Sequence, residues 1–188
     1  TRSDTEVIVH AWEAWGEACV ERFRGMFAFA LWDRHRETLF LARDRLGVKP
    51  LFYALLPDGQ CVFGSELKAV LLHPGVTRTI DPCAVEEYFA VGYVAEPRTI
   101  YASVRKLPPA HTLVLRRGVT PPAPREFWDV RFTLDNRIGF EDAMAELDRR
   151  LQDSIRLRMI SEVPLGAFLS GGVDSSAVVA VMARISDA

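Results

Sequence analysis

Residues 163–182 read VPLGAFLSGGVDSSAVVAVM, and this stretch decides the fold of the chain around it. An apolar run, Val163 to Leu169, precedes Ser170-Gly171-Gly172-Val173-Asp174-Ser175-Ser176, and a second apolar run, Ala177 to Met182, follows. This order predicts a buried strand, a glycine-rich turn and a helix. The glycines let backbone N–H groups converge, and the helix start adds unpaired N–H groups and a positive dipole end. The stretch therefore indicates a phosphate or pyrophosphate site.

This loop differs from the Walker pattern, which needs a lysine that reaches the outer phosphates. No lysine lies between Lys106 and the last residue, and Asp174 stands among serine hydroxyls instead. An aspartate beside phosphates is repelled unless it holds a magnesium ion that the phosphates share. The alternative is a plain turn in which Asp174 or Ser175 caps the following helix.

The composition is that of a globular chain of one or two domains, with 188 residues, 49% hydrophobic and 26% charged. A net charge of −2 without a basic stripe argues against nucleic acid, and no apolar run is long enough for a membrane span. The sequence shows no secretory signal. Cys19, Cys61 and Cys83 lack metal or redox spacing, so we expect reduced, inert thiols in a cytoplasmic protein.

Alternating helix and strand signals fill the first 120 residues. A capping box, Ser3 to Glu6, opens a helix that Gly16 ends. Ser65 is expected to cap a short helix through Leu72, and Asp81-Pro82 to open another with Val85, Tyr88 and Phe89 facing inward. Strands are expected at residues 26–32, 38–42, 51–56, 61–63 and 112–115, with a hairpin turn at 57–59.

The proline-rich stretch 121–124 predicts a stiff connector. The secondary-structure signals change beyond it, from mainly strands to a mixture of helix and strand. Apolar residues then recur at helical spacing from Phe140 to Ile155. We therefore place a domain boundary near residues 120–138. One strand and one helix cannot form an open sheet, so we expect the sequence to be a segment of a longer polypeptide.

Six motifs together resemble the glutamine-dependent asparagine synthetases. They follow in that family's order: SDTEVI (3–8), GMFAFALWD (25–33), ARDRLGVKPL (42–51), GSELKA (64–69), RKLPP (105–109) and VPLGAFLSGGVDSS (163–176). Each motif alone is moderate evidence, and Ser-Gly-Gly-x-Asp-Ser marks only the wider ATP-pyrophosphatase group. The resemblance covers essentially the whole chain.

The resemblance implies two partial domains. Residues 1–120 would be the C-terminal part of a type 2 glutamine amidotransferase domain, an N-terminal-nucleophile hydrolase with an α-β-β-α sandwich. Residues 121–138 would be a linker, and residues 139–188 the start of an α/β ATP-pyrophosphatase domain. Such enzymes release ammonia from glutamine, adenylate aspartate with ATP and Mg²⁺, and form asparagine, AMP and pyrophosphate. The implied partners are the small molecules glutamine, aspartate and ATP. A homodimer would add a second copy of the chain.

The resemblance also assigns roles to single residues. Asp4 would bind the α-amino group of glutamine; from the residues alone, it is a favourable charge in a first helical turn. Leu169 would lie at the adenosine edge, Ser170 to Ser176 would hold pyrophosphate, and Asp174 would bind magnesium. No catalytic or binding role is assigned to Arg43, Asp44 or Lys49. An Arg-Asp pair in a loop more often forms a structural ion pair or stabilises a turn.

Three departures from the family pattern leave other functions open. The nucleophilic N-terminal cysteine, a glutamine-binding arginine and an Asn-Gly-Glu stretch would lie upstream, so no catalytic residue is assigned here. Cys19 cannot replace that cysteine because its amine is in a peptide bond, and Thr1 precedes a helix cap rather than a buried strand. The alternatives are a ring-closing ligase of the β-lactam synthetase or lasso-peptide cyclase type, and a non-catalytic remnant. The segment alone is expected to be inactive.

Overall fold

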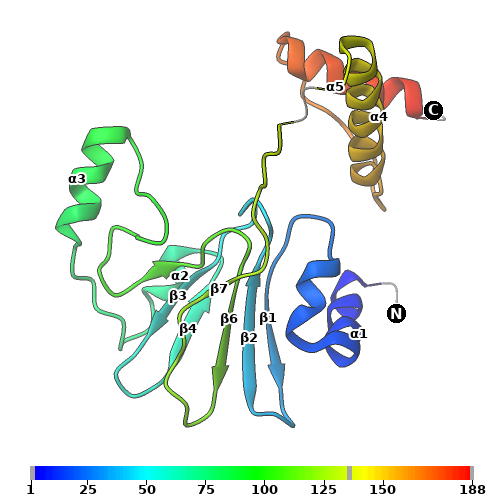
Figure 1. The fold of residues 1–188 in the computed structure, drawn as a ribbon. Coiled ribbons are helices and arrows are strands. Elements are labelled where there is room, and N and C mark those ends of the chain that lie inside the picture. Colours follow the sequence, from blue (N-terminus) through cyan, green and yellow to red (C-terminus); the bar gives the residue numbers. More distant parts are fainter. Residues whose placement is uncertain (1–2, 135–136, 187–188) are drawn as a thin grey trace. The chain divides into compact units, whose positions relative to one another are not determined.

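The computed structural model describes residues 3–134 and 137–186, which form two compact units, residues 1–131 and 132–188. Two antiparallel sheets build the first unit (Figure 1). The four-stranded sheet has the order β1-β2-β6-β7, with β1 at Ala28–Asp33, β2 at Thr38–Arg43, β6 at His111–Arg116 and β7 at Arg125–Glu126. The three-stranded sheet has the order β4-β3-β5, with β3 at Phe52–Leu55, β4 at Cys61–Gly64 and β5 at Arg105–Lys106.

Strand β2 lies at the centre of the first unit because both of its faces are buried. Phe40 and Ala42 point to one face, where they pack with Trp12 and with Cys19 and Val20. These partners come from α1 (Asp4–Trp15) and the 3₁₀ helix η1 (Gly16–Arg22). The rings of Trp12 and Phe40 are 4.9 Å apart. A strand covered on both sides needs a continuous apolar run, which explains the sequence TLFLA.

The opposite face of β2 meets the second sheet. Leu41 and Leu113 of the four-stranded sheet pack against Tyr53 of β3 and against Leu51 and Leu107. Beyond β3, Ala54 packs with Val70 of α2 (Leu67–Val70) and with Val76 and Val104. The two sheets therefore share one apolar core, and helices lie on the outer side of each sheet.

Two helix predictions in this unit are wrong in part. Glu66, and not Ser65, occupies the N-cap position of α2. Helix α3 (Pro82–Val91) begins as predicted, with Asp81 as N-cap and Pro82 in the first turn. However, Tyr88 and Phe89 are 53% and 82% exposed, because the helix buries Ala84 instead. The aromatic rings of Tyr88 and Phe89 therefore remain on the solvent side of α3.

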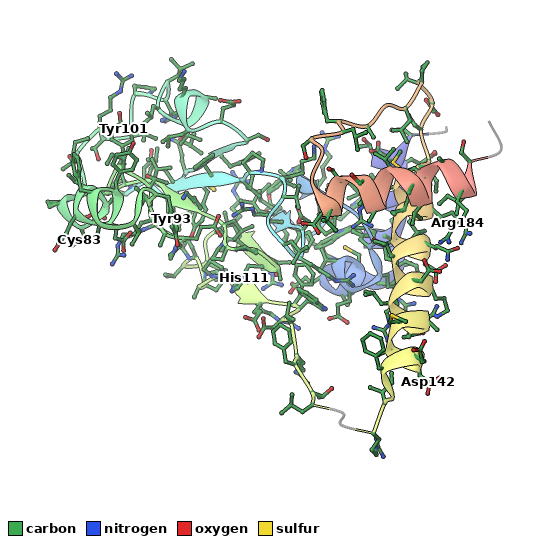
Figure 2. The ribbon with its side chains drawn as sticks, turned by 90° about the horizontal axis from the view of Figure 1, so that it is seen from above. Cys83, Tyr93, Tyr101, His111, Asp142 and Arg184 are labelled. Atoms are coloured by element: carbon green, nitrogen blue, oxygen red, sulfur yellow. The ribbon has the colours of Figure 1, made fainter. Side chains whose placement is uncertain are left out.

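The second unit contains α4 (Phe140–Arg158) and α5 (Val173–Ile185), which pack with Ile155 and Val181 buried. Arg184 Nη2 on α5 also donates to Asp148 Oδ1 on α4 at 2.8 Å; Figure 2 labels Arg184. The predicted buried strand over Val163–Leu169 is wrong: this segment has no regular structure, and Phe168 is fully exposed. A strand needs a neighbour for its N–H and C=O groups, and residues 137–186 supply none.

Candidate functional site

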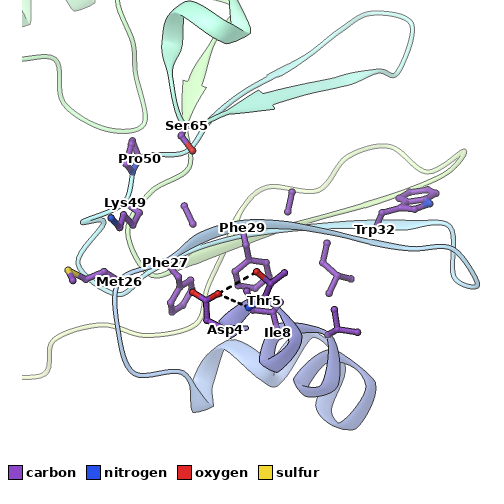
Figure 3. A pocket seen from close by; sticks show the side chains of 14 residues that line it. Asp4, Thr5, Ile8, Met26, Phe27, Phe29, Trp32, Lys49, Pro50 and Ser65 are labelled. Atoms are coloured by element: carbon purple, nitrogen blue, oxygen red, sulfur yellow. Dashed lines mark hydrogen bonds between the residues drawn. The ribbon is translucent and has the colours of Figure 1, made fainter. Parts of the chain in front are cut away.

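A pocket of about 720 Å³ lies in the first unit, along β1 and beside the first turns of α1. Most of the lining residues are apolar, and β1 contributes a continuous part of the wall that includes Phe29, Leu31 and Trp32. Four polar side chains complete the lining: Asp4, Thr5, Lys49 and Ser65. The close-up in Figure 3 shows Asp4, Met26 and Lys49 toward one end and Trp32 toward the other. An apolar cavity with a few convergent polar groups is typical of a small-molecule site.

Strand β1 contributes its outer edge to this pocket. Within the sheet, β1 pairs only with β2, from Ala28↔Arg43 to Asp33↔Thr38. No other strand among the described residues occupies the far side of β1. Trp12 Nε1 of α1 donates to Asp33 Oδ2 at 2.9 Å and so fixes the helix at one end of the strand.

Asp4, the predicted glutamine ligand, lies in the first turn of α1 and lines the pocket. Its Oδ1 accepts from the Thr5 N–H at 2.8 Å, and the N-cap hydroxyl of Ser3 accepts from the same N–H at 3.2 Å. The exposed Asp4 carboxylate thus stabilises the helix start and faces the pocket at the same time. Both roles considered for Asp4 are compatible with this position.

Arg43 and Asp44 fold the loop that carries Lys49 into the pocket wall. The carboxylate of Asp44 is 1% exposed. It accepts from the backbone N–H groups of Leu46, Val48 and Lys49 at 3.2, 3.0 and 2.9 Å. The Arg43 guanidinium donates to the carbonyls of Gly47 and Lys49 at 2.8 Å each. The expectation of a turn brace is confirmed, with each residue acting through its own backbone partners.

Glu96 is an ion-pair partner of Arg43 that the sequence did not reveal. Its Oε1 accepts from Arg43 Nη1 at 2.7 Å, across a sequence separation of 53 residues. The same Nη1 donates to the Leu107 carbonyl at 2.7 Å. A buried arginine needs an anionic partner, so Arg43 at a strand end was a signal that such a partner exists. Its position in the chain could not be predicted.

The predicted phosphate loop has the geometry of a helix start. Gly172 is the N-cap of α5, so Val173, Asp174 and Ser175 form the first helical turn. Asp174 and Ser175 are therefore not caps. Gly171 has φ of +81°, a conformation that favours glycine. Ser175 Oγ lies 3.0 Å from Ser170 Oγ and 3.1 Å from the Gly172 carbonyl, which closes the loop.

The loop leaves several groups available to an anion. Leu169, Ser170 and Val173 are exposed, and the first N–H groups of α5 have no intrahelical acceptor. Asp174 supplies one exposed carboxylate, and no cluster of three metal-ligating side chains exists among the described residues. A single carboxylate suits magnesium that is held mainly by phosphate oxygens, and it does not suit a cage made only of protein ligands. Asp174 therefore fits the predicted magnesium role.

Comparison with known proteins follows the division of the chain. Residues 1–128 match the glutamine amidotransferase domain family. The chain belongs to this family. Residues 146–188 match the asparagine synthase family, so the predicted resemblance is confirmed over both parts. The glutamine amidotransferase match includes α1, β1 and the loop from Asp44 to Lys49. The asparagine synthase match includes α5.

Curated relatives are similar to this chain along nearly its whole length. Asparagine synthetase [glutamine-hydrolyzing] 3 of Bacillus subtilis is 40% identical over 96% of this chain. Asparagine synthetase [glutamine-hydrolyzing] 1 of the same organism is 35% identical over 96%, and amidase chyE of Penicillium rubens is 30% identical over 97%. The chain spans 29%, 28% and 27% of the lengths of these three relatives. No helix in the described parts of the chain is both long and apolar enough to cross a membrane.

Proposed function

We propose that this chain works within an enzyme that converts aspartate to asparagine with glutamine as nitrogen donor and ATP as activator. The observation that carries the proposal is the joint presence, in one chain, of an amidotransferase match and of the Ser-Gly-Gly-Val-Asp-Ser-Ser loop at a helix start. In this proposal, residues 1–120 belong to an α-β-β-α glutaminase domain, 121–138 link the domains, and 139–188 begin the ATP-pyrophosphatase domain.

In the glutaminase part, Asp4 binds the α-ammonium group of glutamine. An ammonium group donates to a carboxylate, and Asp4 lines the pocket with a carboxylate whose Oδ1 accepts from the Thr5 N–H. The apolar wall of β1 contacts the methylene groups of the substrate. Hydrolysis of the side-chain amide uses a nucleophile from outside residues 1–188 and releases ammonia.

In the synthetase part, the loop from Leu169 to Ser176 binds ATP. The aspartate β-carboxylate attacks the α-phosphorus, the bond to the β-phosphate oxygen breaks, and pyrophosphate leaves. The N–H groups of the first turn of α5 and the hydroxyls of Ser170 and Ser175 hold the departing phosphates. Asp174 holds Mg²⁺, which neutralises phosphate charge when bound. Ammonia then displaces AMP from the β-aspartyl-adenylate.

The test uses the protein encoded by the complete reading frame and follows aspartate-dependent exchange of pyrophosphate into ATP. Asp174→Asn is expected to reduce this exchange by about a hundredfold or more while glutamine hydrolysis continues. Asp142→Asn is the matched control, because Asp142 is also an acidic residue in a first helical turn, that of α4, as Figure 2 indicates. Exchange that proceeds without aspartate, or that survives Asp174→Asn, contradicts the proposed reaction.

A second assay measures whether glutamine hydrolysis is coupled to AMP formation. It distinguishes an asparagine synthetase from a ring-closing ligase and from a non-catalytic remnant of either enzyme. A ring-closing ligase needs no ammonia, so it would show no coupling between glutamine hydrolysis and AMP formation. The name of chyE makes this assay necessary, because that relative is called an amidase and not a synthetase. We expect ATP to change the melting temperature of residues 1–188 only slightly, because the proposal assigns other ATP contacts to residues outside this range. A large shift would contradict that assignment.

A further inference from the structure

The polar lining of the first-unit pocket includes one negative and one positive side chain. The inference drawn from these two charges rests on the proposed glutaminase function. Fourteen of the described residues line the pocket, and among these Asp4 is the acidic side chain and Lys49 the basic one. Both lie toward the same end in Figure 3. The pocket thus offers one anion and one cation to a ligand whose remaining contacts are mostly apolar.

The backbone at Lys49 is fixed on both sides of the residue. Its N–H donates to Asp44 Oδ2 at 2.9 Å, and its carbonyl accepts from Arg43 Nε at 2.8 Å. Pro50 follows, and its ring restricts the conformation of Lys49 further. Arg43 is 6% exposed and is itself held by Glu96. The position from which the Lys49 side chain departs is therefore set before any ligand binds.

No hydrogen bond or ion pair joins the ammonium group of Lys49 to another residue in the described ranges 3–134 and 137–186. The side chain is exposed, and no acceptor or carboxylate of the described residues lies within bonding distance of Nζ. By contrast, Lys106 Nζ donates to the Val94 carbonyl at 2.7 Å. Two nearly buried charged side chains thus position a lysine whose own charge has no partner in the described structure.

We propose that Lys49 binds the α-carboxylate of glutamine while Asp4 binds its α-ammonium group. Glutamine carries these two charges on two groups bonded to the same carbon and has a neutral side chain beyond them, which matches a pocket with one anion, one cation and an apolar wall. Lys49 is a substrate-binding residue in this assignment, and Arg43 and Asp44 are positioning residues that act through it. The glutamine-binding arginine expected outside this chain would be a second cation at the same carboxylate.

The test measures glutaminase kinetics of the protein encoded by the complete reading frame with two ligands. Glutamine is the substrate, and L-glutaminamide, which has a neutral amide in place of the α-carboxylate, is the competitor. Lys49→Met is expected to raise KM for glutamine about tenfold or more, because a charge-assisted hydrogen bond is lost. The competition constant of L-glutaminamide is expected to stay within about twofold, since it cannot use the lysine charge.

Two further variants separate charge recognition from structure. Lys49→Arg is expected to keep most of the discrimination between the two ligands, because it keeps a cation at this position. Lys68→Met, an exposed lysine on α2 outside the pocket lining, is expected to leave both constants unchanged. An equal effect of Lys49→Met on both ligands, or no effect, overturns the assignment of Lys49 alone. Absence of glutamine hydrolysis in the unmodified protein overturns the proposed function together with this assignment.

Discussion

Replacement of Asp44 by alanine tests how strongly one buried carboxylate holds the pocket loop. The side chain accepts three backbone N–H groups, those of Leu46, Val48 and Lys49. A hydrogen bond to a charged group contributes about 1.5–3 kcal/mol. The side chains of these three residues are partly or fully exposed, so water can reach the loop once the carboxylate is gone. We therefore expect a loss of about 3 kcal/mol in the free energy of unfolding, well below the sum of three bonds.

The assay is urea unfolding followed by tryptophan fluorescence, which reports on the first unit because all four tryptophans precede residue 132. The expected loss corresponds to a decrease of about 10 °C in melting temperature. Asp44→Asn keeps one acceptor oxygen but turns an N–H group toward a backbone donor, so it is expected to lie between alanine and the native residue. Asp58→Ala removes an exposed turn acceptor for the Gln60 N–H and is expected to cost about 0.5 kcal/mol. Equal effects of Asp44→Ala and Asp58→Ala would refute the brace.

Three further outcomes follow from single contacts. Trp12→Phe removes the donor that does most to lower the pKa of Asp33 below its ordinary value. The lowered pKa of Asp33 stabilises the fold above the ordinary pKa of an aspartate, and this contribution is lost as the pH falls through the lowered pKa. The difference between the urea midpoints of native and variant protein should therefore shrink from pH 7 toward acid, to the part that comes from lost packing of Trp12 in the core; a separation that does not change with pH would contradict this. The expectation of three inert packing cysteines is wrong for Cys83, which is exposed. Burial raises the pKa of Cys19 to about 11, so iodoacetamide at neutral pH should modify Cys83 first, as followed by mass spectrometry; equally fast modification of Cys19 would contradict this. Gly171→Ala places alanine at φ +81° and should lower helix stability by about 1 kcal/mol in circular dichroism, whereas an unchanged midpoint would refute the strain.

Local patterns predicted the elements of the first unit well. The apolar run before Asp33 and the run after Glu37 form the β1–β2 hairpin, because the intervening polar residues favour a turn. Asp33 Oδ1 accepts from two N–H groups of that turn at 2.9 Å each, which is why the hairpin closes there. Asp81-Pro82 likewise determines the start of α3 through a side-chain cap and a fixed proline φ.

The sequence did not reveal features that depend on contacts between residues far apart in the chain, such as strand pairing. Pairing of β2 with β6 brings Thr38 opposite Arg116, and no local signal specifies this distance along the chain. The apolar run before Ser170 predicted a buried strand, but burial and pairing require neighbours that residues 137–186 do not contain. The same division applies to single residues: the role of Asp174 was predicted from its own motif and stays a prediction, whereas the contact of Glu96 with Arg43 could be found only from the fold.

The open edge of β1 has a consequence for any biophysical work on the chain by itself. Alternate residues of Ala28–Asp33 direct backbone donors and acceptors to the side on which the described residues supply no strand, and Trp32 is 54% exposed. Such an edge accepts a strand from another molecule, so concentrated samples should associate through β-strand addition. At the other edge, β7 has only two residues and offers little for pairing. A dimer measured with these residues alone would therefore report an uncovered strand, and it would say nothing about the oligomeric state of a complete enzyme.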